Sequence, residues 1–278
     1  MNCYLCGSPA TRLFLKIKDH NLLICDGCGL IYEQERRAGG GISADQEKFL
    51  AEYLLEEKSY AQYFDEKLEW IESLRRPGTL LDVGCGAGTF LRCARQRGWQ
   101  VMGVEGSAPA AAYARSTGLE VREGIIESLS FSGAFDVVTV FQAIEHFADP
   151  VAFLNHVRSL IKPGGFAVLT TPDRKGFMGK LQGKGWFGYY NDEHVFFYDA
   201  SSFKRTLEKA GFSGVAVRSE SGRALSPSWV FTRLFEYYYT APGMAQRLMA
   251  RSKPVWKWFD WLRIREPAVN LVAIGWRG

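Results

Sequence analysis

The chain has 278 residues, 47% of them hydrophobic, and a formal net charge of +4. This length is enough for one substantial α/β domain with an accessory module. The small net charge does not favour nucleic-acid binding. No apolar run approaches the roughly 18–20 residues that span a bilayer, and the first residues lack the basic and apolar regions of a secretory signal. We therefore expect a cytoplasmic protein without a transmembrane segment.

Four of the six cysteines form two pairs, Cys3-x2-Cys6 and Cys25-x2-Cys28, separated by 18 residues. Two such pairs joined by a hairpin predict a tetrahedral zinc site, here a zinc ribbon over residues 1–37. Because all four ligands would be protein sulfur, the zinc would be structural. Two disulfides or a redox CxxC are the alternatives. Disulfides fit poorly with a cytoplasmic chain, and a redox motif would not need a matched second pair.

The region after the ribbon has two parts. Residues 38–78 are expected to form a helical linker or cap, because apolar residues recur at helical spacing from about 44 to 76 and Pro77-Gly78 ends the pattern. Residues 79–278 alternate short apolar strands with helices. This alternation predicts an α/β fold with a mostly parallel, seven-stranded Rossmann-like sheet. Strands are expected at 79–83, 100–104, 119–122, 135–141, 165–171, 214–219 and 269–276, and helices at 88–98, 108–117, 149–161 and 200–210.

A helical insertion is expected at residues 221–267, before the last strand. It is rich in aromatic residues, and between Arg218 and Glu266 there are nine basic and four acidic residues. We expect a lid that packs on the sheet. A surface for an anionic acceptor such as a nucleotide sugar, and shallow peripheral contact with a membrane, are the alternatives.

A glycine turn follows the first buried strand of the domain. The strand ends in Asp82-Val83, and Gly84, Gly86 and Gly88 come next at alternate positions. Glycines there allow a ligand to approach the backbone closely. In open α/β sheets ligands bind beyond the carboxyl ends of the strands. The turn therefore predicts a nucleotide-type cofactor site.

Two acids distinguish between the possible cofactors. The next strand ends at Glu105, which can hold two ribose hydroxyls. A dinucleotide fingerprint would need glycine where Thr89 stands, and it places no acid at the position of Asp82. An acid there suits the cationic amino-acid end of S-adenosylmethionine (SAM) better than a pyrophosphate.

On these residues, 79–172 resembles a class I SAM-dependent methyltransferase. Residues 124–129 resemble the family's adenine loop, 135–147 the strand and loop that line the methyl-donor pocket, and 160–165 the turn into the fifth strand. Tyr60 resembles a tyrosine that closes over the SAM carboxylate. The residues expected to contact SAM are Tyr60, Asp82, Gly84, Cys85, Gly86, Gly88, Glu105, Gly106, Ser107, Ile126, Glu127, Phe141, Gln142 and Ala143.

One candidate for catalysis lies at the end of a glycine-rich loop. Five glycines between residues 172 and 188 predict a mobile loop that could close over an acceptor. The following segment resembles the Tyr-His-Glu-His segment of zinc-containing sugar C-methyltransferases. The resemblance implies that His194 serves as base, with Glu193 and Tyr190 beside it, although the spacing to Tyr190 is one residue longer. The alternative is that His194 only anchors the loop.

A second candidate is Glu145-His146. It resembles the Glu-x-x-Glu-His segment of ubiquinone-pathway O-methyltransferases, which is associated with a divalent metal. Gln142 replaces the first glutamate here, which argues against a metal. The alternative is that Glu145 and His146 shape the pocket.

The leading interpretation is a SAM-dependent methyltransferase with a zinc ribbon, similar to sugar C-methyltransferases and related small-molecule enzymes. Its acceptor would be a sugar, nucleotide sugar or glycan precursor, methylated on carbon or oxygen. O-methylation of a quinone-like or natural-product acceptor is the alternative. A nucleic-acid modifier that reads through its ribbon is disfavoured, because residues 1–32 contain only three basic residues. A SAM-binding protein without catalysis is the remaining class.

Overall fold

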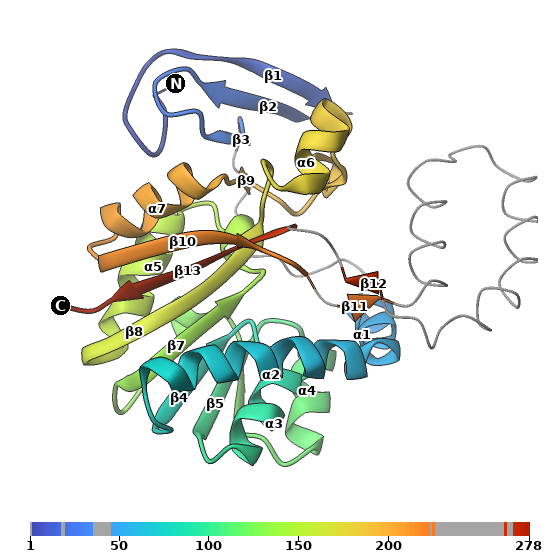
Figure 1. The fold of residues 1–278 in the computed structure, drawn as a ribbon, viewed down its shortest axis with the longest axis vertical. Helices are drawn as coiled ribbons and strands as arrows, with labels where there is room; N and C mark the ends of the chain where they lie inside the picture. The colour runs from blue at the N-terminus through green and yellow to red at the C-terminus, as the bar shows by residue number, and fades with distance from the viewer. Residues whose placement is uncertain (1, 18–19, 36–45, 223, 226–263, 266–268) are drawn as a thin grey trace, which may run out of the picture.

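The computed structural model describes residues 2–17, 20–35, 46–222, 224–225, 264–265 and 269–278. Its centre is a seven-stranded sheet in the order β10-β13-β8-β7-β4-β5-β6 (Figure 1). The pairs from β8 to β6 are parallel, and only β13 is antiparallel to its neighbours. The predicted fold class is confirmed. In chain order the strands are β4 (Thr79–Val83), β5 (Gln100–Glu105), β6 (Val121–Glu123), β7 (Phe135–Phe141), β8 (Ile161–Pro172), β10 (Ser213–Glu220) and β13 (Asn270–Trp276).

Helices cover both faces of the sheet, because its central strands carry apolar side chains on both faces. Leu80 and Leu81 are both fully buried, yet they belong to different core clusters on opposite faces. Val137 and Val138 divide in the same way, as successive strand residues must. The helices are α2 (Glu57–Leu74), α3 (Thr89–Gln96) and α4 (Ala108–Ser116) on one face, and α5 (Pro150–Ser159) and α7 (Ala200–Lys209) on the other (Figure 1).

The described part of the cap region, 46–78, is mostly helical, but its helix is not continuous. It forms two helices, α1 (Gln46–Leu55) and α2, which are interrupted at Glu56, where ψ is 11°. Residues 36–45, where the cap was expected to begin, lie outside the described part. The interruption turns α1 away from the axis of α2 and toward α4, beside which it packs. The α1 helix thereby reaches over the carboxyl ends of the strands.

The N-terminal ribbon is a small antiparallel sheet of β1 (Thr11–Ile17), β2 (His20–Cys25) and β3 (Ile31–Glu33). A fourth strand, β9 (Phe196–Phe197), pairs with β3 and comes from the segment after the glycine-rich loop. Within that segment lie α6 (Phe177–Gln182) and two 3-10 turns, η3 (Gly183–Gly185) and η4 (Phe187–Tyr190).

The predicted insertion at 221–267 lies largely outside the described residues. Two short strands lie near its two ends, β11 (Ala224–Leu225) and β12 (Ile264–Arg265), and they pair with each other. In the described part of the chain, no helix has both the length and the apolar character needed to cross a membrane.

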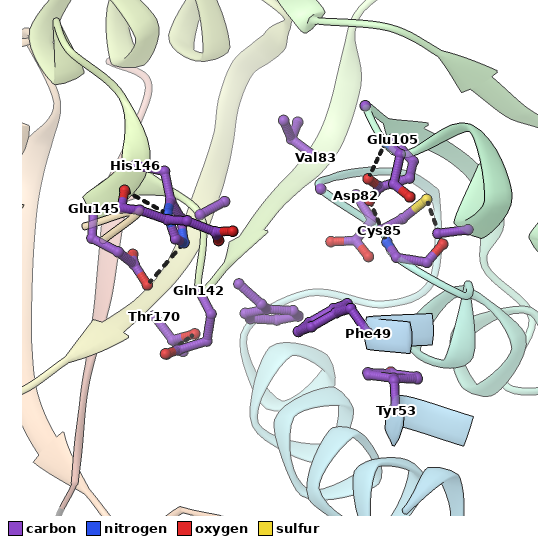
Figure 2. A pocket seen from close by; sticks show the side chains of 18 of the residues that line it. Phe49, Tyr53, Asp82, Val83, Cys85, Glu105, Gln142, Glu145, His146 and Thr170 are labelled. Carbon is purple, nitrogen blue, oxygen red and sulfur yellow. Dashed lines mark hydrogen bonds and ion pairs between the residues drawn. The ribbon is translucent and has the colours of Figure 1, made fainter. Parts of the chain in front are cut away.

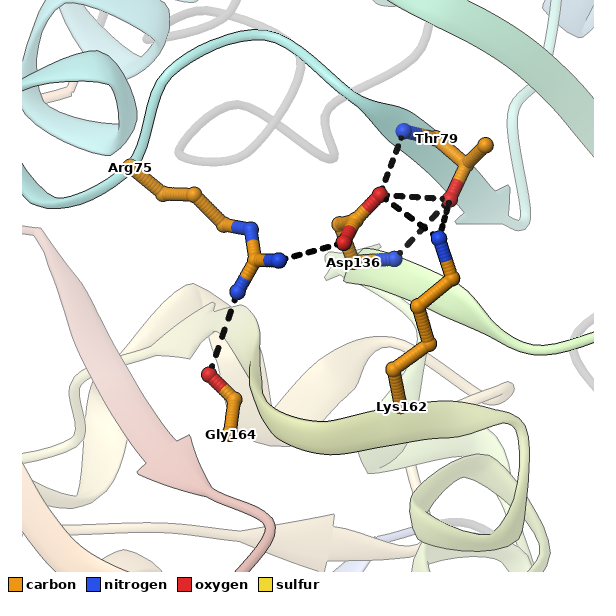
Figure 3. A network of polar contacts seen from close by, with 5 residues as sticks. All are labelled: Arg75, Thr79, Asp136, Lys162 and Gly164. Atoms are coloured by element: carbon orange, nitrogen blue, oxygen red, sulfur yellow. Dashed lines mark hydrogen bonds and ion pairs between the residues drawn. The ribbon is translucent and has the colours of Figure 1, made fainter.

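A network of polar contacts lies at the amino ends of β4, β7 and β8, opposite the strand ends that carry the glycine turn (Figure 3). The buried carboxylate of Asp136 accepts hydrogen bonds from the backbone N–H and the hydroxyl of Thr79, both at 2.8 Å, and from Nζ of Lys162 at 2.9 Å. Arg75 forms an ion pair with the same carboxylate and donates to the carbonyl of Gly164 at 3.2 Å. Burial opposes ionisation of Asp136, but these donors outweigh it and hold its pKa well below the ordinary value.

Candidate functional site

A cavity of about 530 Å³ lies beyond the carboxyl ends of β4, β5, β7 and β8 (Figure 2). Its floor is formed by the ends of these strands, and residues of α1 and α2 line its other side. Strand ends in an open α/β sheet leave such a crevice because the loops that follow them diverge to the two faces. The cavity is therefore where the sequence places the cofactor.

The glycine turn forms one wall of the cavity. Gly84 and Gly86 have φ values of +76° and +53°, which residues with a side chain rarely adopt. The backbone N–H groups of Gly84 and Cys85 donate to the carbonyl of Val104 at 2.8 and 3.1 Å, so the turn is held against β5. Gly88 lies outside the lining and serves as the N-cap of α3.

Two carboxylates face this wall. Asp82 is 3% exposed and accepts a hydrogen bond of 2.7 Å from the hydroxyl of Thr139. Burial, with a smaller contribution from the charge of Glu105, raises the pKa of Asp82 to about 7, against the effect of Thr139. Glu105 accepts from the backbone N–H groups of Gly86 and Ser107, both at 2.7 Å. Two neighbouring carboxylates in a partly dry cavity would be stabilised by a cationic ligand.

The structure brings most of the expected cofactor residues to this cavity. Gly88 and Glu127 are the two that do not line it. The α1 helix adds wall residues that the sequence did not single out as ligand contacts. The ring of Tyr53 stacks on that of Tyr60, with centroids 4.2 Å apart, and its buried hydroxyl has a raised pKa. The expected residues that line the cavity are Tyr60, Asp82, Gly84, Cys85, Gly86, Glu105, Gly106, Ser107, Ile126, Phe141, Gln142 and Ala143, and those added by α1 are Gln46, Phe49, Leu50 and Tyr53.

The α1 residues were overlooked because helical spacing alone marks them as packing residues. Phe49 and Tyr53 belong to the apolar pattern of the cap. Only the interruption at Glu56 brings them over the strand ends. The sequence carries no strong signal for it, since position 56 is neither glycine nor proline.

The opposite end of the cavity holds three titratable side chains. Glu145 and His146 lie on η2 (Ile144–His146), directly after β7, and His194 lies just before β9. Their nearest ligand atoms all lie within 4.8 Å of one another. Glu193 also lines the cavity, whereas Tyr190 does not: it is 47% exposed, and its hydroxyl lies 3.4 Å from the carbonyl of Lys184.

His194 is held by its own loop. Its Nδ1 lies 3.2 Å from the carbonyl oxygen of Gly188, so Nδ1 carries the hydrogen, and Nε2 accepts from the side-chain amide of Asn191 at 3.0 Å. Burial, and to a lesser degree the neighbouring His146, lowers the pKa of His194 to about 3. This imidazole is neutral, and both of its nitrogens are engaged within the loop.

His146 has the opposite arrangement. Its Nδ1 lies 3.0 Å from the carbonyl oxygen of Glu193, which places the hydrogen on Nδ1 and leaves Nε2 with a lone pair. That Nε2 lies 3.9 Å from Oε1 of Glu145. Glu145 is 1% exposed; its Oε2 accepts from the hydroxyl of Thr171 at 3.0 Å, and its Oε1 has no hydrogen-bond partner. Burial raises the pKa of Glu145.

Gln142 turns away from these three side chains. It has a φ of +52°, and its amide donates to the hydroxyl of Thr170 at 3.1 Å. The position that carries the first glutamate in the metal-associated motif is thus bonded to β8.

The four N-terminal cysteines come together as the spacing predicts. The Sγ atoms of Cys3 and Cys28 lie 3.6 Å apart, those of Cys6 and Cys25 lie 3.5 Å apart, and all four lie within 4.8 Å of one another. These separations exceed a disulfide bond, and the cysteines are free. Burial opposes ionisation of Cys25, but backbone and thiol hydrogen bonds outweigh it and lower its pKa to about 7. Four sulfurs with this arrangement suit a tetrahedral metal ion.

Comparison with known proteins gives the class. Residues 55–217 match the family described as Methyltransferase domain, and the chain belongs to this family. The resemblance of the sequence to the methyltransferase family is confirmed by this match, and the seven-stranded sheet agrees with it.

The curated relatives share part of their length with this chain. Ubiquinone biosynthesis O-methyltransferase from Cereibacter sphaeroides (strain ATCC 17029 / ATH 2.4.9) is 37% identical over 117 residues, which are 38% of this chain and 47% of that protein. The protein of the same name from Paramagnetospirillum magneticum is 33% identical over 171 residues, 56% of this chain and 68% of that protein. The chain spans about half the length of the first of these relatives.

Solved structures share the fold at low identity. A SAM-dependent methyltransferase from Thermotoga maritima, described as a possible histamine N-methyltransferase, aligns with a TM-score of 0.56 at 18% identity over 84% of this chain and 98% of its own. Phosphoethanolamine N-methyltransferase 2 from Haemonchus contortus, solved with S-adenosyl-L-methionine, aligns with a TM-score of 0.53 at 17% identity, over 76% of this chain and 52% of its own.

Proposed function

We propose that the chain transfers a methyl group from SAM to a hydroxyl oxygen of an uncharged small molecule. The observation that carries the proposal is one cavity with two carboxylates beside a glycine turn at one end and an imidazole with an open Nε2 at the other. The first end suits a cationic cofactor, and the second suits a group that loses a proton.

The cofactor end fits SAM in shape and charge. The positive φ values of Gly84 and Gly86 keep side chains out of the turn, and the buried Asp82 lacks a cationic partner among the described residues. Bound there, SAM supplies an electrophilic methyl group whose departure leaves a neutral thioether. Glu105 accepts hydrogen bonds from two backbone N–H groups in the ligand-free structure. When SAM is bound, its carboxylate would accept hydrogen bonds from the ribose hydroxyls.

At the acceptor end, we propose that Nε2 of His146 takes the proton that the acceptor hydroxyl loses. The acceptor oxygen forms its bond to the methyl carbon as its O–H proton passes to that nitrogen. The carboxylate of Glu145, 3.9 Å away, would stabilise the imidazolium that results. His194, whose nitrogens are already engaged, forms part of the wall beside it.

The lining supports an uncharged acceptor. Among the described residues that line the cavity there is no lysine or arginine, whereas Phe49, Phe147 and Phe187 are present. An anionic group on the acceptor would meet Glu145 and Glu193, with no lysine or arginine in the described lining to balance its charge. The curated relatives are named O-methyltransferases, which favours a phenolic or quinone-like acceptor over a nucleotide sugar.

Isothermal titration with SAM, followed by turnover with radiolabelled SAM, tests the proposal. The acceptor panel pairs catechols and other phenols with nucleotide sugars of similar size, and the product is identified by NMR. We expect micromolar SAM binding and an O-methyl product from a phenol. Absence of SAM binding, or methylation confined to carbon or to nucleotide sugars, would overturn the proposal.

We also propose that Cys3, Cys6, Cys25 and Cys28 hold a structural zinc ion. Their four sulfurs lie within 4.8 Å of one another, and four protein sulfurs are a complete ligand set for a tetrahedral structural zinc. Elemental analysis of purified protein should give about one zinc per chain, and Cys25→Ser should reduce it. A folded wild-type protein without zinc would contradict this assignment.

A further inference from the structure

The four-cysteine ribbon contacts the acceptor end of the cavity through its backbone. Strand β3 pairs with β9, Tyr32 opposite Phe196, and the N–H of Glu33 donates to the carbonyl of Val195 at 2.8 Å. The N–H of Val195 in turn donates to the carbonyl of Glu145 at 2.8 Å. A continuous row of backbone hydrogen bonds thus runs from the ribbon through the residue after His194 to the buried acid of the site.

The second cysteine turn has a further link to the same segment. The carbonyl of Gly29, the residue after Cys28, accepts from the guanidinium of Arg174 at 2.8 Å. Arg174 also forms a buried ion pair with Asp199, and its own N–H donates to the carbonyl of Tyr198 at 3.0 Å. Arg174 therefore joins the cysteine turn to both ends of the segment 173–199.

The first cysteine turn is fixed to the helices behind the site. The carbonyls of Tyr4 and Leu5 accept from Nζ of Lys209 on α7, at 2.8 and 2.9 Å. The hydroxyl of Tyr4 accepts from the N–H of Val151, at the start of α5, at 3.0 Å.

Side chains of the ribbon also cover the loop. Ile17, Leu22 and Ile31 share a core cluster with Trp186 and Tyr189. At the start of β2, the buried His20 places Nε2 4.0 Å from the carboxylate of Asp192. The segment that carries His194 is thus packed along much of its length on the ribbon.

We propose that the metal-loaded ribbon is the positioning element of the acceptor wall. The ribbon fixes the position of residues 187–198. Through Val195 and Glu193 it also fixes the orientation of Glu145 and His146. Loss of the metal would loosen the acceptor wall and leave the SAM end, which is built on β4 and β5, in place. This inference rests on the proposed function, and it assigns the ribbon a role at the end of the cavity that binds the acceptor.

Hydrogen exchange of the full-length protein, with and without zinc, tests the proposal. After zinc is removed with a chelator, amides of 187–198 should exchange at least about tenfold faster, as expected when buried hydrogen bonds open more often. Amides of 79–91, and SAM affinity by titration, should change less than about twofold. Unchanged exchange in 187–198, or equal loss at both ends, would overturn the proposal.

A variant that keeps the metal removes the risk that the zinc-free protein unfolds. Arg174→Ala breaks the link to Gly29, while Asp199 keeps Lys175 at 2.7 Å. In zinc-loaded protein it should speed exchange in 187–198, raise the acceptor KM and leave zinc content unchanged. Arg174→Lys should restore part of the protection. The matched control is Arg12→Ala, which removes an exposed ion pair with Asp26 inside the ribbon.

The outcomes separate this inference from the proposed function. If SAM binds and a phenol is methylated but Arg174→Ala behaves like Arg12→Ala, the ribbon is not the positioning element and the proposed function stands. If SAM does not bind to the zinc-loaded wild type, the proposed function fails, while the exchange measurement still tests the ribbon's contact with 187–198.

Discussion

The Nδ1 atom of His146 lies 3.0 Å from the carbonyl oxygen of Glu193, three residues before the strand that pairs with the ribbon. A carbonyl only accepts, so this contact fixes the imidazole tautomer and leaves Nε2 able to take a proton. In His194, by contrast, Nδ1 donates to the carbonyl of Gly188 and Nε2 accepts from Asn191, so neither ring nitrogen is open. The two histidines are thus distinguished by their partners and not by their place in the cavity.

This difference predicts unequal effects of the same substitution. His146→Gln should reduce turnover by roughly 10²–10⁴-fold, because the proton acceptor is lost while the shape is largely kept. His194→Gln should cost less than about tenfold if its role is to hold the loop. Steady-state kinetics with SAM titration as a binding control measures both. The reverse ranking would make His194 the base, as the sequence suggested.

Glu145, the neighbour of His146, should contribute to turnover through its charge. Its Oε1 lies 3.9 Å from Nε2 of His146 and would stabilise the imidazolium that forms when the acceptor loses its proton. Glu145→Gln keeps the shape and removes the charge, so it should reduce kcat by about tenfold or more. Steady-state kinetics measures this effect, with SAM titration as the binding control. An unchanged kcat would separate Glu145 from the proton transfer.

Asp82 predicts that SAM binding is linked to protons. Its pKa of about 7 in the ligand-free protein means that it is partly protonated at neutral pH. A cationic ligand favours the carboxylate, so SAM affinity should rise with pH up to about 7 and then level off. Titration calorimetry at pH 6 in buffers of different ionisation enthalpy should reveal proton release. No proton release would contradict the role of Asp82.

Because of the same raised pKa, the ionised form of Asp82 destabilises the folded protein when no ligand is bound. Since the folded-state pKa exceeds the unfolded value near 4, its contribution is full below pH 4 and is lost as pH rises through about 7. Asp82→Asn should therefore stabilise the ligand-free protein at pH 8, by up to about 4 kcal/mol, and less at pH 5. Chemical denaturation at both pH values, with SAM affinity as the second readout, tests this trade of stability for binding.

Asp136 should behave in the opposite way. Its donors hold its folded-state pKa below the unfolded value, so its contribution is present above about pH 4 and is lost as the pH falls toward the folded-state pKa. Asp136→Ala should destabilise the protein by about 2–4 kcal/mol at pH 7, because the donors of Thr79, Lys162 and Arg75 lose the carboxylate that they share. The control is Asp26→Ala, whose exposed pair with Arg12 should contribute less than about 1 kcal/mol. Equal effects of the two substitutions would contradict the network's role.

Local patterns made the sheet predictable. The bounds of β4 and β7 coincide with the predicted 79–83 and 135–141, because runs of apolar residues between turn signals mark buried strands. The glycine turn and the acids after two strands were readable for the same reason: each depends on residues close together in the chain. The cysteine spacing likewise anticipated the cluster of four sulfurs.

Long-range contacts were not predictable in this way. The interruption at Glu56 places α1 over the cavity, and no breaker residue announces it. The pairing of β9 with β3 joins residues more than 160 positions apart, and two residues are too short a strand for any periodicity to show.

The sequence by itself therefore determined the class of protein, the sheet and the cofactor end, since strand periodicity, glycine conformations and acids at strand ends are local properties. Only the tertiary structure decided the acceptor end. Which histidine keeps an open nitrogen depends on carbonyls of distant residues, and the contact between the ribbon and the His194 segment depends on packing that no single stretch of the chain encodes.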